Sequence, residues 1–342
     1  MTPLRESTER KGAPGTTRDA GNVPEGWALV ACPLCGRRDH DVVFAATCAL
    51  FDTAAEVTLR RCTCGLLLTN PQPQGPALAA FYATDAYYTH RPPRGAAGRL
   101  RQALRRWQLR GPLCIVRRAG ERWLGWSRYA QRLALDAFPL RRGMRLLDFG
   151  CGNGDFLHTA RALGLHAAGV EPDEAARSAA RRGGASVYES LDALESDSQN
   201  AAKFDRITLK HVLEHLSLPV ETVARLGERL APGGRMLIAV PNAASLQAER
   251  FREHWIGYDM PRHLWHFDAD ALARLVERAN LRVVTLRSVE LEWFASESNA
   301  VRQRAGLQPL AYRAGSLRRL ERTQRGAELV VVARASADTG GA

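Results

Sequence analysis

The chain has 342 residues, 45% of them hydrophobic, and a formal net charge of +12. This length allows one substantial core plus a smaller module. No run of about 18 apolar residues is present, which argues against a membrane-spanning helix, and the first thirty residues lack the apolar stretch of a secretory signal. We therefore expect a cytoplasmic protein. The basic charge favours acidic partners without choosing among nucleic acid, anionic lipid and nucleotide-linked substrates.

Two cysteine pairs follow the polar start of the chain. Residues 1–27 hold too little apolar surface to fold and are expected to form a disordered tail. In residues 28–90 each pair precedes a glycine, and the four cysteines are Cys32, Cys35, Cys62 and Cys64. Such pairs on turns between short strands are typical of a zinc ribbon, in which a tetrahedral Zn²⁺ ion replaces a core too small to hold itself. We expect a structural metal, because four protein ligands leave no open position.

The second cysteine pair leaves the identity of the fourth ligand open. It reads CxC, one residue shorter than the CxxC of the first pair, and His40 and Cys48 are alternatives for the last position. Reduced thiols without a metal are the alternative state. A disulfide would require an oxidising compartment, which nothing in the sequence supports.

Residues 91–142 are rich in arginine and carry two amphipathic helical patterns. In the first, Leu100, Leu104 and Trp107 recur at helical spacing before a Gly-Pro pair ends the pattern. These helices either cover an edge of the sheet or place their arginines on an anionic membrane surface or a phosphorylated substrate. The sequence leaves both roles open.

The sequence RLLDFGCGNGDF, residues 145–156, predicts a buried strand, a glycine-rich turn and the start of a helix. The strand ends in Asp148, and glycines alternate at positions 150, 152 and 154. Glycines there let a ligand approach the main-chain N–H groups of the helix N-terminus. A dinucleotide fingerprint would need a glycine at position 155, where the chain has Asp155. The pattern therefore argues against NAD.

Strand and helix patterns alternate through the rest of the chain. The predicted strands are a second within His166–Asp173, ending at Glu171, a third near Ala185–Tyr188, a fourth at Phe204–Leu209, a fifth at 235–240, a sixth at Leu281–Val289 and a seventh at Ala327–Ala335. The predicted helices are Val220–Leu230 and Asp268–Asn280, with a basic helical insertion at about Ser296–Thr323. This alternation is typical of an α/β sheet.

The series LLDFGCGNG, GVEP, FDRITLKHVLEH and LAPGGRMLIAVPN resembles, in order and spacing, the motifs of class I S-adenosylmethionine (SAM) methyltransferases. It is similar to the broad group that includes ubiquinone-biosynthesis O-methyltransferases, and DMPRHLWHF at 259–267 resembles a signature of that group. The resemblance implies a Rossmann-like α/β fold over residues 143–336, with a seven-stranded, mostly parallel sheet whose strand seven is antiparallel. The small zinc-ribbon module precedes it, and residues 337–342 are expected to form a tail.

The resemblance also implies a SAM site around the glycine turn. The carboxylate of Glu171 would accept hydrogen bonds from both ribose hydroxyls, and Asp192 would face the adenine. The residues implied for the cofactor are Asp148, Gly150, Cys151, Gly152, Gly154, Glu171, Pro172, Asp192, Lys210 and His211.

Methyl transfer to oxygen or carbon also needs a base, for which histidine is the usual residue near neutral pH. Two clusters offer one, and they contain His211, Glu214 and His215 at the spacing of one helical face, and His263 and His266 on the 259–267 segment. His263 is our first candidate for the base, His215 the second, and His211 a further candidate. In related quinone O-methyltransferases a similar Glu/His turn holds a divalent cation, which is the alternative role for the first cluster.

The acceptor is expected to be a small or carrier-linked metabolite, such as a sugar, a phenol or quinone-like ring, or a lipid-linked glycan. Arg262 is a candidate for binding its phosphate or carboxylate. The chain lacks an NPPY-type turn after strand four and has no cysteine after Cys151, which argues against methylation of nucleic-acid bases. Peripheral contact with the inner membrane face stays open.

The competing hypothesis is a nucleic-acid-binding zinc-ribbon protein with a degenerate Rossmann domain that does not bind SAM. The joint presence of Asp148, the three glycines and Glu171 argues against it, because a relic domain would have no chemical need for all of them.

Overall fold

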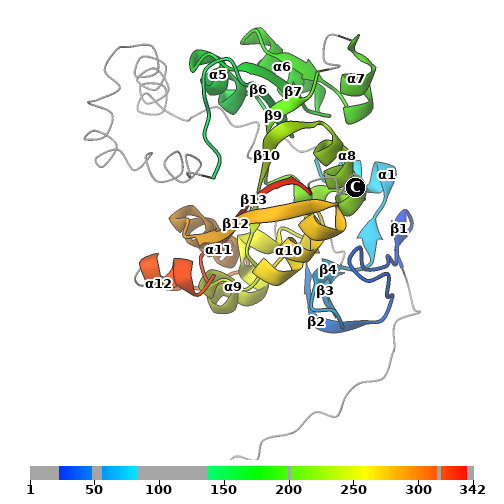
Figure 1. Ribbon diagram of the computed structural model, residues 1–342. Coiled ribbons are helices and arrows are strands. Elements are labelled where there is room, and N and C mark those ends of the chain that lie inside the picture. The colour runs from blue at the N-terminus through cyan, green and yellow to red at the C-terminus, as the bar shows by residue number, and fades with distance from the viewer. Residues whose placement is uncertain (1–22, 48–55, 83–136, 199–201, 314–316, 337–342) are drawn as a thin grey trace, which may run out of the picture.

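The computed structural model describes residues 23–47, 56–82, 137–198, 202–313 and 317–336 (Figure 1). Three predicted segments lie largely or wholly outside these ranges: the tail 1–27, the arginine-rich helices of 91–142 and the tail 337–342. Cys48 lies outside them as well. Among the helices that the described ranges contain, none is both long and apolar enough to cross a membrane.

Seven strands form the main sheet, in the spatial order β12-β13-β10-β9-β6-β7-β8. Their bounds are β6 Arg145–Phe149, β7 His166–Val170, β8 Ser186–Tyr188, β9 Phe204–Lys210, β10 Leu230–Pro241, β12 Leu281–Val289 and β13 Glu328–Ala335. Strands β6 to β10 pair in parallel, whereas β13 is antiparallel to both β10 and β12. The predicted seven-stranded Rossmann-like sheet with an antiparallel last strand is confirmed.

Helices cover both faces of this sheet. The helices described after β6 are α5 Asp155–Ala162, α6 Glu174–Arg182, α7 Leu191–Ser196, α8 Pro219–Glu228, α9 Leu246–Phe251, α10 Ala269–Arg278, α11 Glu292–Arg304 and α12 Leu317–Arg322, of which α9 and α11 pack on each other. Successive strand residues point to opposite faces. On β6, Leu147 packs in one core with Val223 of α8 and Leu272 of α10, while Leu146 packs in another with Leu157 of α5.

Four helices begin at a Ser or Asp whose side chain accepts a hydrogen bond from a main-chain N–H in the first turn, the usual N-cap arrangement. These caps are Asp173 for α6, Ser190 for α7, Ser245 for α9 and Asp268 for α10. The predicted helix start at Asp268 is confirmed.

Two local predictions were wrong. The fifth strand begins at Leu230, because the 231–234 turn is taken into β10 as an irregularity between Leu230 and Arg235. The segment after β9 does not form a regular α-helical turn. It has His211 in the left-handed region (φ 53°), followed by the short 3-10 helix η3, Leu213–His215.

The N-terminal strands form a smaller sheet that also uses a strand from the far end of the chain. The order is β11-β4-β3-β2, with bounds β2 His40–Thr47, β3 Glu56–Cys62, β4 Leu67–Thr69 and β11 Trp265–His266. A separate pair joins β1 Trp27–Ala28 to β5 Gln72–Pro73, and α1 Gly75–Ala80 follows. We call residues 27–47 and 56–82 the cysteine module. In Figure 1 its blue strands β2 to β4 lie beside α10.

Candidate active site and metal centre

The turn between β6 and α5 needs glycine for reasons of space as well as conformation. Gly150, Gly152 and Gly154 have φ of 73°, 52° and 81°. A Cβ at Gly150 would lie 2.3 Å from the Val212 side chain, and one at Gly154 would lie 2.7 Å from Ala180. Any larger residue would displace these neighbours. The contact with Val212 also places this turn directly beside the segment that follows β9.

Glu171, the first residue after β7, is tied to the same turn. Its Oε2 accepts a hydrogen bond from Gly152 N at 2.8 Å, and its Oε1 accepts one from Asp173 N at 3.0 Å. Gly152 follows β6 and Glu171 follows β7, so the two residues stand at the carboxyl ends of adjacent parallel strands, where ligands bind in open α/β sheets. The structure therefore brings together the glycine turn and the acidic residue that the sequence assigned to SAM.

Asp148, at the end of β6, forms a buried ion pair with Lys210, at the end of β9. The Asp148 side chain is 2% exposed, and its Oδ1 lies 3.4 Å from Lys210 Nζ. The Thr208 hydroxyl also donates to Asp148. Burial raises the pKa of Asp148, while Lys210 and Thr208 oppose that rise. Lys210 Nζ in turn lies 3.6 Å from the centre of the Phe156 ring.

The remaining residues implied for the cofactor have different surroundings. The Cys151 thiol packs against Gly169, where a Cβ would lie 2.6 Å from the sulfur. The Pro172 carbonyl accepts a hydrogen bond from Arg177 at 2.9 Å. Asp192, on α7, pairs with Arg225 of α8 at 2.5 Å, and its side chain is 79% exposed. A role for Asp192 opposite the adenine stays a prediction.

His211 lies between two buried glutamates. Its Nδ1 is 3.4 Å from Glu214 Oε1, and its Nε2 is 2.8 Å from Oε1 of Glu328, the first residue of β13. Burial alone would lower the pKa of His211, but the two carboxylates outweigh it and raise the pKa to about 10. His211 is therefore a cation at neutral pH and has no site left to accept a proton.

His215 and His263 meet with their ring centroids 4.6 Å apart. His263 Nδ1 lies 2.8 Å from the Gly257 carbonyl oxygen, and His215 Nδ1 lies 3.1 Å from that of Arg262. Because a carbonyl only accepts, we assign the proton of each ring to Nδ1 and the lone pair to Nε2. Within the ranges that the structure describes, neither Nε2 has a hydrogen-bond partner.

Both of these histidines are neutral. Burial lowers the pKa of His215 to about 4, with His263 adding to the effect, and burial lowers the pKa of His263 to about 3. The Glu214 carboxylate, which is 1% exposed, lies 3.9 Å from His263 Nε2. Two imidazole lone pairs and one carboxylate thus converge, with Glu214 and His263 buried and His215 half-buried.

Glu214, His215 and His263 could hold a divalent cation. One ligand atom from each lies within 4.8 Å of the others. Two neutral imidazoles and a carboxylate suit zinc, iron or manganese, and Nδ1–H groups bound to carbonyls orient the rings as they do around many metals. The ligand set that fits therefore differs from the sequence grouping, because His211 faces Glu328 and His263 takes its place.

Arg262 has a partner within its own loop. It is 4% exposed, and its Nη2 lies 2.7 Å from Asp259. The role of Arg262 in binding a phosphate or carboxylate of the acceptor stays a prediction.

Sequence reasoning missed three residues that contact the histidines. Glu328 forms the ion pair with His211 described above. The Thr69 hydroxyl lies 2.6 Å from the His263 carbonyl oxygen and 3.0 Å from His266 Nε2, and the Tyr82 hydroxyl lies 2.8 Å from His215 Nδ1. None of the three stands in a motif with chemical content, so a single sequence carries no signal for them.

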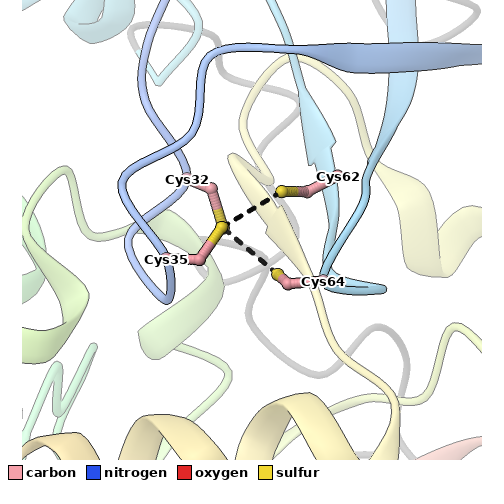
Figure 2. Close-up of side chains that lie close together, drawn as sticks. All are labelled: Cys32, Cys35, Cys62 and Cys64. Carbon is pink, nitrogen blue, oxygen red and sulfur yellow. Dashed lines mark hydrogen bonds between the residues drawn. The ribbon is translucent and has the colours of Figure 1, made fainter.

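The four cysteines lie together, as the spacing predicted (Figure 2). The Cys32 and Cys64 sulfurs are 3.6 Å apart, those of Cys35 and Cys62 are 3.4 Å apart, and all four lie within 4.8 Å of one another. A disulfide would need about 2.05 Å, whereas sulfurs on a tetrahedral zinc ion lie about 3.8 Å apart, from Zn–S bonds of about 2.3 Å. The cluster fits a small zinc module.

Both ring nitrogens of His40 have other polar partners, so His40 does not compete for the fourth ligand position of the cysteine cluster. One ring nitrogen lies 3.0 Å from the Arg37 carbonyl oxygen, and the other lies 3.0 Å from the Asn70 side-chain nitrogen. Among the described residues, Cys64 is therefore the fourth member of the cluster.

The sheet and this site define a class of protein. A seven-stranded sheet with β13 reversed between β10 and β12, a glycine turn after β6 and a carboxylate after β7 are the features of a class I SAM-dependent methyltransferase domain. The chain carries such a domain, and residues 121–286 match the family described as "Methyltransferase domain".

Curated relatives match a shorter region. The chain is 35% identical over 105 residues to the ubiquinone biosynthesis O-methyltransferase of Aromatoleum aromaticum, covering 29% of this chain and 45% of the relative. It is 34% identical over 120 residues to the enzyme of the same name from Methylocella silvestris, covering 34% and 44%. The chain thus spans less than half the length of these relatives.

Similar solved structures include a SAM-dependent methyltransferase from Mesorhizobium loti, with 16% identity, a TM-score of 0.41, and coverage of 60% of this chain and 96% of that one. Another, from Archaeoglobus fulgidus, has 18% identity, a TM-score of 0.40, and coverage of 68% and 98%.

Proposed function

We propose that the protein transfers the methyl group of SAM to an oxygen or carbon atom of a small or carrier-linked metabolite. The observation that carries this proposal is the pair of neutral imidazoles, His215 and His263, whose Nε2 lone pairs converge beside Glu214. His215 lies in the segment after β9, and His263 reaches it from the 259–267 loop. Val212, in the segment after β9, lies against the glycine turn. A site for a methyl donor and a site for a proton therefore adjoin each other.

The reaction is an in-line displacement. An acceptor oxygen attacks the methyl carbon, the carbon–sulfur bond breaks, and S-adenosylhomocysteine leaves while the acceptor hydroxyl loses its proton. The glycine turn would bind the methionine part of SAM, and Glu171 would accept hydrogen bonds from its ribose. We call Asp148, Lys210, Glu171 and this turn the SAM half of the site.

The proton of the acceptor goes to His263 Nε2 in this mechanism, with His215 Nε2 as the second choice. Both rings are unprotonated at neutral pH, and their Nδ1–H bonds to carbonyls fix which nitrogen is free. The adjacent Glu214 carboxylate stabilises the imidazolium that forms. His211 Nδ1 lies 3.4 Å from Glu214 Oε1. We call Glu214, His215 and His263 the acceptor half.

The ligand atoms of Glu214, His215 and His263 also favour a second mechanism, in which the acceptor half binds a divalent cation. When bound, such an ion would polarise the acceptor hydroxyl and lower its pKa. Titration of Mn²⁺ into the wild-type protein and into Glu214→Gln, followed by calorimetry, separates the two versions. Binding that is lost in Glu214→Gln supports the ion, and no binding to either protein leaves the histidine mechanism alone.

We further propose that Cys32, Cys35, Cys62 and Cys64 hold one structural Zn²⁺ ion. The sulfur separations and the burial of Cys32 and Cys62 support it. Four thiolates close the coordination sphere, so this metal would take no part in the reaction.

A phenolic acceptor is the class that the surroundings favour. The Phe294 ring, which is buried, lies 6.1 Å from His211, and the exposed Trp293 ring stacks on it at 4.5 Å, so that Trp293 offers an apolar, planar surface in this region. The curated relatives are named for ubiquinone biosynthesis, which is consistent with a phenol. Sugars and lipid-linked glycans remain the other acceptors of this proposal.

The arginines of residues 91–142 support contact with an anionic membrane surface, where a lipid-linked acceptor would be found. Each arginine near such a surface contributes about 1 kcal/mol to binding, and salt weakens the effect. Co-sedimentation with neutral and with anionic vesicles at low salt tests the idea. Equal partitioning to both would reject it.

SAM binding decides between the enzyme and the competing nucleic-acid-binding protein. Calorimetry with purified protein is expected to show micromolar affinity for SAM, and no binding at millimolar SAM would exclude the methyltransferase. Transfer of label from methyl-labelled SAM into an extract of the native host would then identify the acceptor.

A further inference from the structure

We propose that the cysteine module is a component of the acceptor half, in which Thr69 and Tyr82 are positioning residues for the histidines. The inference rests on the function proposed above and goes beyond it. A zinc ribbon beside an enzyme domain is commonly an independent attachment. Here the module instead supplies hydrogen bonds to the loop and the side chains that would handle the proton.

Thr69 is the first of the two contacts. Thr69 is fully buried, and its hydroxyl donates a hydrogen bond to the His263 carbonyl oxygen at 2.6 Å. Because that hydrogen is committed, the same oxygen accepts from His266 Nε2–H at 3.0 Å. One hydroxyl therefore fixes the main chain at His263 and the tautomer of His266.

Further hydrogen bonds from residues near Thr69 fix the main chain next to His263. Thr69 N donates to the Leu264 carbonyl at 3.1 Å, and the Gln72 side chain donates to the same carbonyl at 3.1 Å. The strands β4 and β11 pair in antiparallel register, with Trp265 opposite Leu68. The segment directly after His263 is thus part of the sheet of the module.

Tyr82 is the second contact, and it reaches the other histidine. Its hydroxyl lies 2.8 Å from His215 Nδ1, the nitrogen that also faces the Arg262 carbonyl. The proton on Nδ1 is shared between these two oxygens, which leaves Nε2 for the acceptor. The module therefore contacts the main chain of His263 through Thr69 and the ring of His215 through Tyr82.

The cysteines are linked to Thr69 through a short stretch of chain. Cys62 N donates to the Leu66 carbonyl at 2.9 Å, so the CTCG knuckle turns directly into β4. Leu66 and Leu68 are fully buried in the main core, and Arg274 of α10 donates to the Cys64 carbonyl at 2.8 Å. A change in the cysteine cluster would shift β4, and β4 carries Thr69.

The SAM half is built from other contacts. Its contacts join Glu171 to Gly152 and Asp148 to Thr208 and Lys210, all within residues 148–210 and none from the cysteine module. Damage to the module should therefore disturb the histidines while SAM still binds. This separation distinguishes a positioning role from a merely structural one.

The test compares Thr69→Val, which removes the hydroxyl and keeps the shape, with Thr69→Ser, which keeps the hydroxyl. Thr63→Val is the matched control, because Thr63 lies on the exposed surface of the module and bonds only Arg37 among the described residues. Tyr82→Phe tests the second contact. Each full-length protein is labelled with ¹⁵N-histidine, and long-range ¹H–¹⁵N spectra report the tautomer of each ring, assigned with His263→Gln, His266→Gln and His215→Gln.

In the wild type we expect His266 to carry its proton on Nε2, and His263 and His215 to carry theirs on Nδ1. Thr69→Val should shift the signals of His263 and His266, and Tyr82→Phe those of His215, with SAM affinity unchanged by calorimetry. Thr69→Ser and Thr63→Val should resemble the wild type. Once an acceptor is known, the loss of one buried hydrogen bond should lower kcat roughly tenfold in Thr69→Val.

Unchanged histidine spectra in both Thr69→Val and Tyr82→Phe would overturn the proposal. If Thr69→Val does not fold, Tyr82→Phe decides alone. A protein that binds no SAM would reject the proposed function, while the histidine tautomers would still report on the positioning, so the two failures are distinguishable.

Discussion

The SAM half and the acceptor half lie side by side but are assembled in different ways. The glycine turn, Glu171 and Asp148 come from one continuous stretch of strands and helices, and their contacts follow from the topology of a parallel sheet. Glu214, His215 and His263 come together because the loop of residues 259–267 bonds both the segment after β9 and the cysteine module. One half is local to the fold, and the other depends on a second unit.

Removing the metal of the cysteine module should produce the largest difference between the two halves. In Cys32→Ser/Cys35→Ser the module loses its metal site, and we expect a destabilisation of roughly 3 kcal/mol or more. Elemental analysis should fall from one zinc ion per chain to none, and residues 28–90 should become sensitive to protease. SAM affinity should persist.

Cys151→Ser is the control for zinc content, because Cys151 is a buried cysteine of the SAM half and belongs to no cluster of ligands in the described ranges. It should retain zinc. A wild-type protein purified without stoichiometric zinc would reject the prediction.

Substitutions in the SAM half should weaken SAM binding and leave the zinc content unchanged, which is the reverse of the effect of the cysteine substitutions. Asp148→Ala and Glu171→Ala each remove charge-assisted hydrogen bonds, so each should weaken SAM binding by roughly 1.5–3 kcal/mol. Zinc content and histidine tautomers should stay as in the wild type. Calorimetry measures the first effect. Asp270→Ala, at an exposed position on α10, is the matched control, and equal affinity in all four proteins would place the cofactor elsewhere.

The acceptor half should dominate the response of stability to acid. His215 and His263 have folded pKa values of about 4 and 3, below the unfolded value near 6.5. Their contribution to the free energy of unfolding is therefore complete above pH 6.5 and is lost as the pH falls toward 4. Near pH 5 each histidine should lower the free energy of unfolding by about 1–2 kcal/mol. Chemical denaturation at a series of pH values measures it. His263→Asn should flatten the slope, whereas His166→Asn, at an exposed position, should not.

His211 should act in the other direction and with the smallest effect. Its folded pKa is raised to about 10, so its contribution is present below pH 6.5 and is lost as the pH rises toward 10. Because its side chain is 26% exposed, solvent reduces the effect to roughly 1 kcal/mol. Denaturation between pH 7 and 10 should show a decline that is absent in Glu328→Gln. Identical slopes in the two proteins would argue against the ion pair.

Sequence reasoning recovered the parts of the site that are encoded over short distances. The strands, the glycine turn, Glu171 and the cysteine pairs follow from local hydrophobic patterns and from spacings that physical chemistry restricts. It could not recover contacts such as that of Thr69 with His263, which are 194 residues apart. It also placed His211, Glu214 and His215 on one helical face, because the left-handed conformation of His211 leaves no trace in the residue pattern.

Strand β11 is only two residues long, yet it belongs to one unit by sequence and to another by hydrogen bonding. The two units therefore cannot be exchanged freely during evolution. A lineage that replaced the N-terminal unit would need a new edge for Trp265 and His266 and a new hydroxyl at the place of Thr69. The same constraint applies to protein engineering: a fragment cut between the two units would keep the residues of the SAM half and expose an unpaired strand edge, which is a surface prone to aggregation.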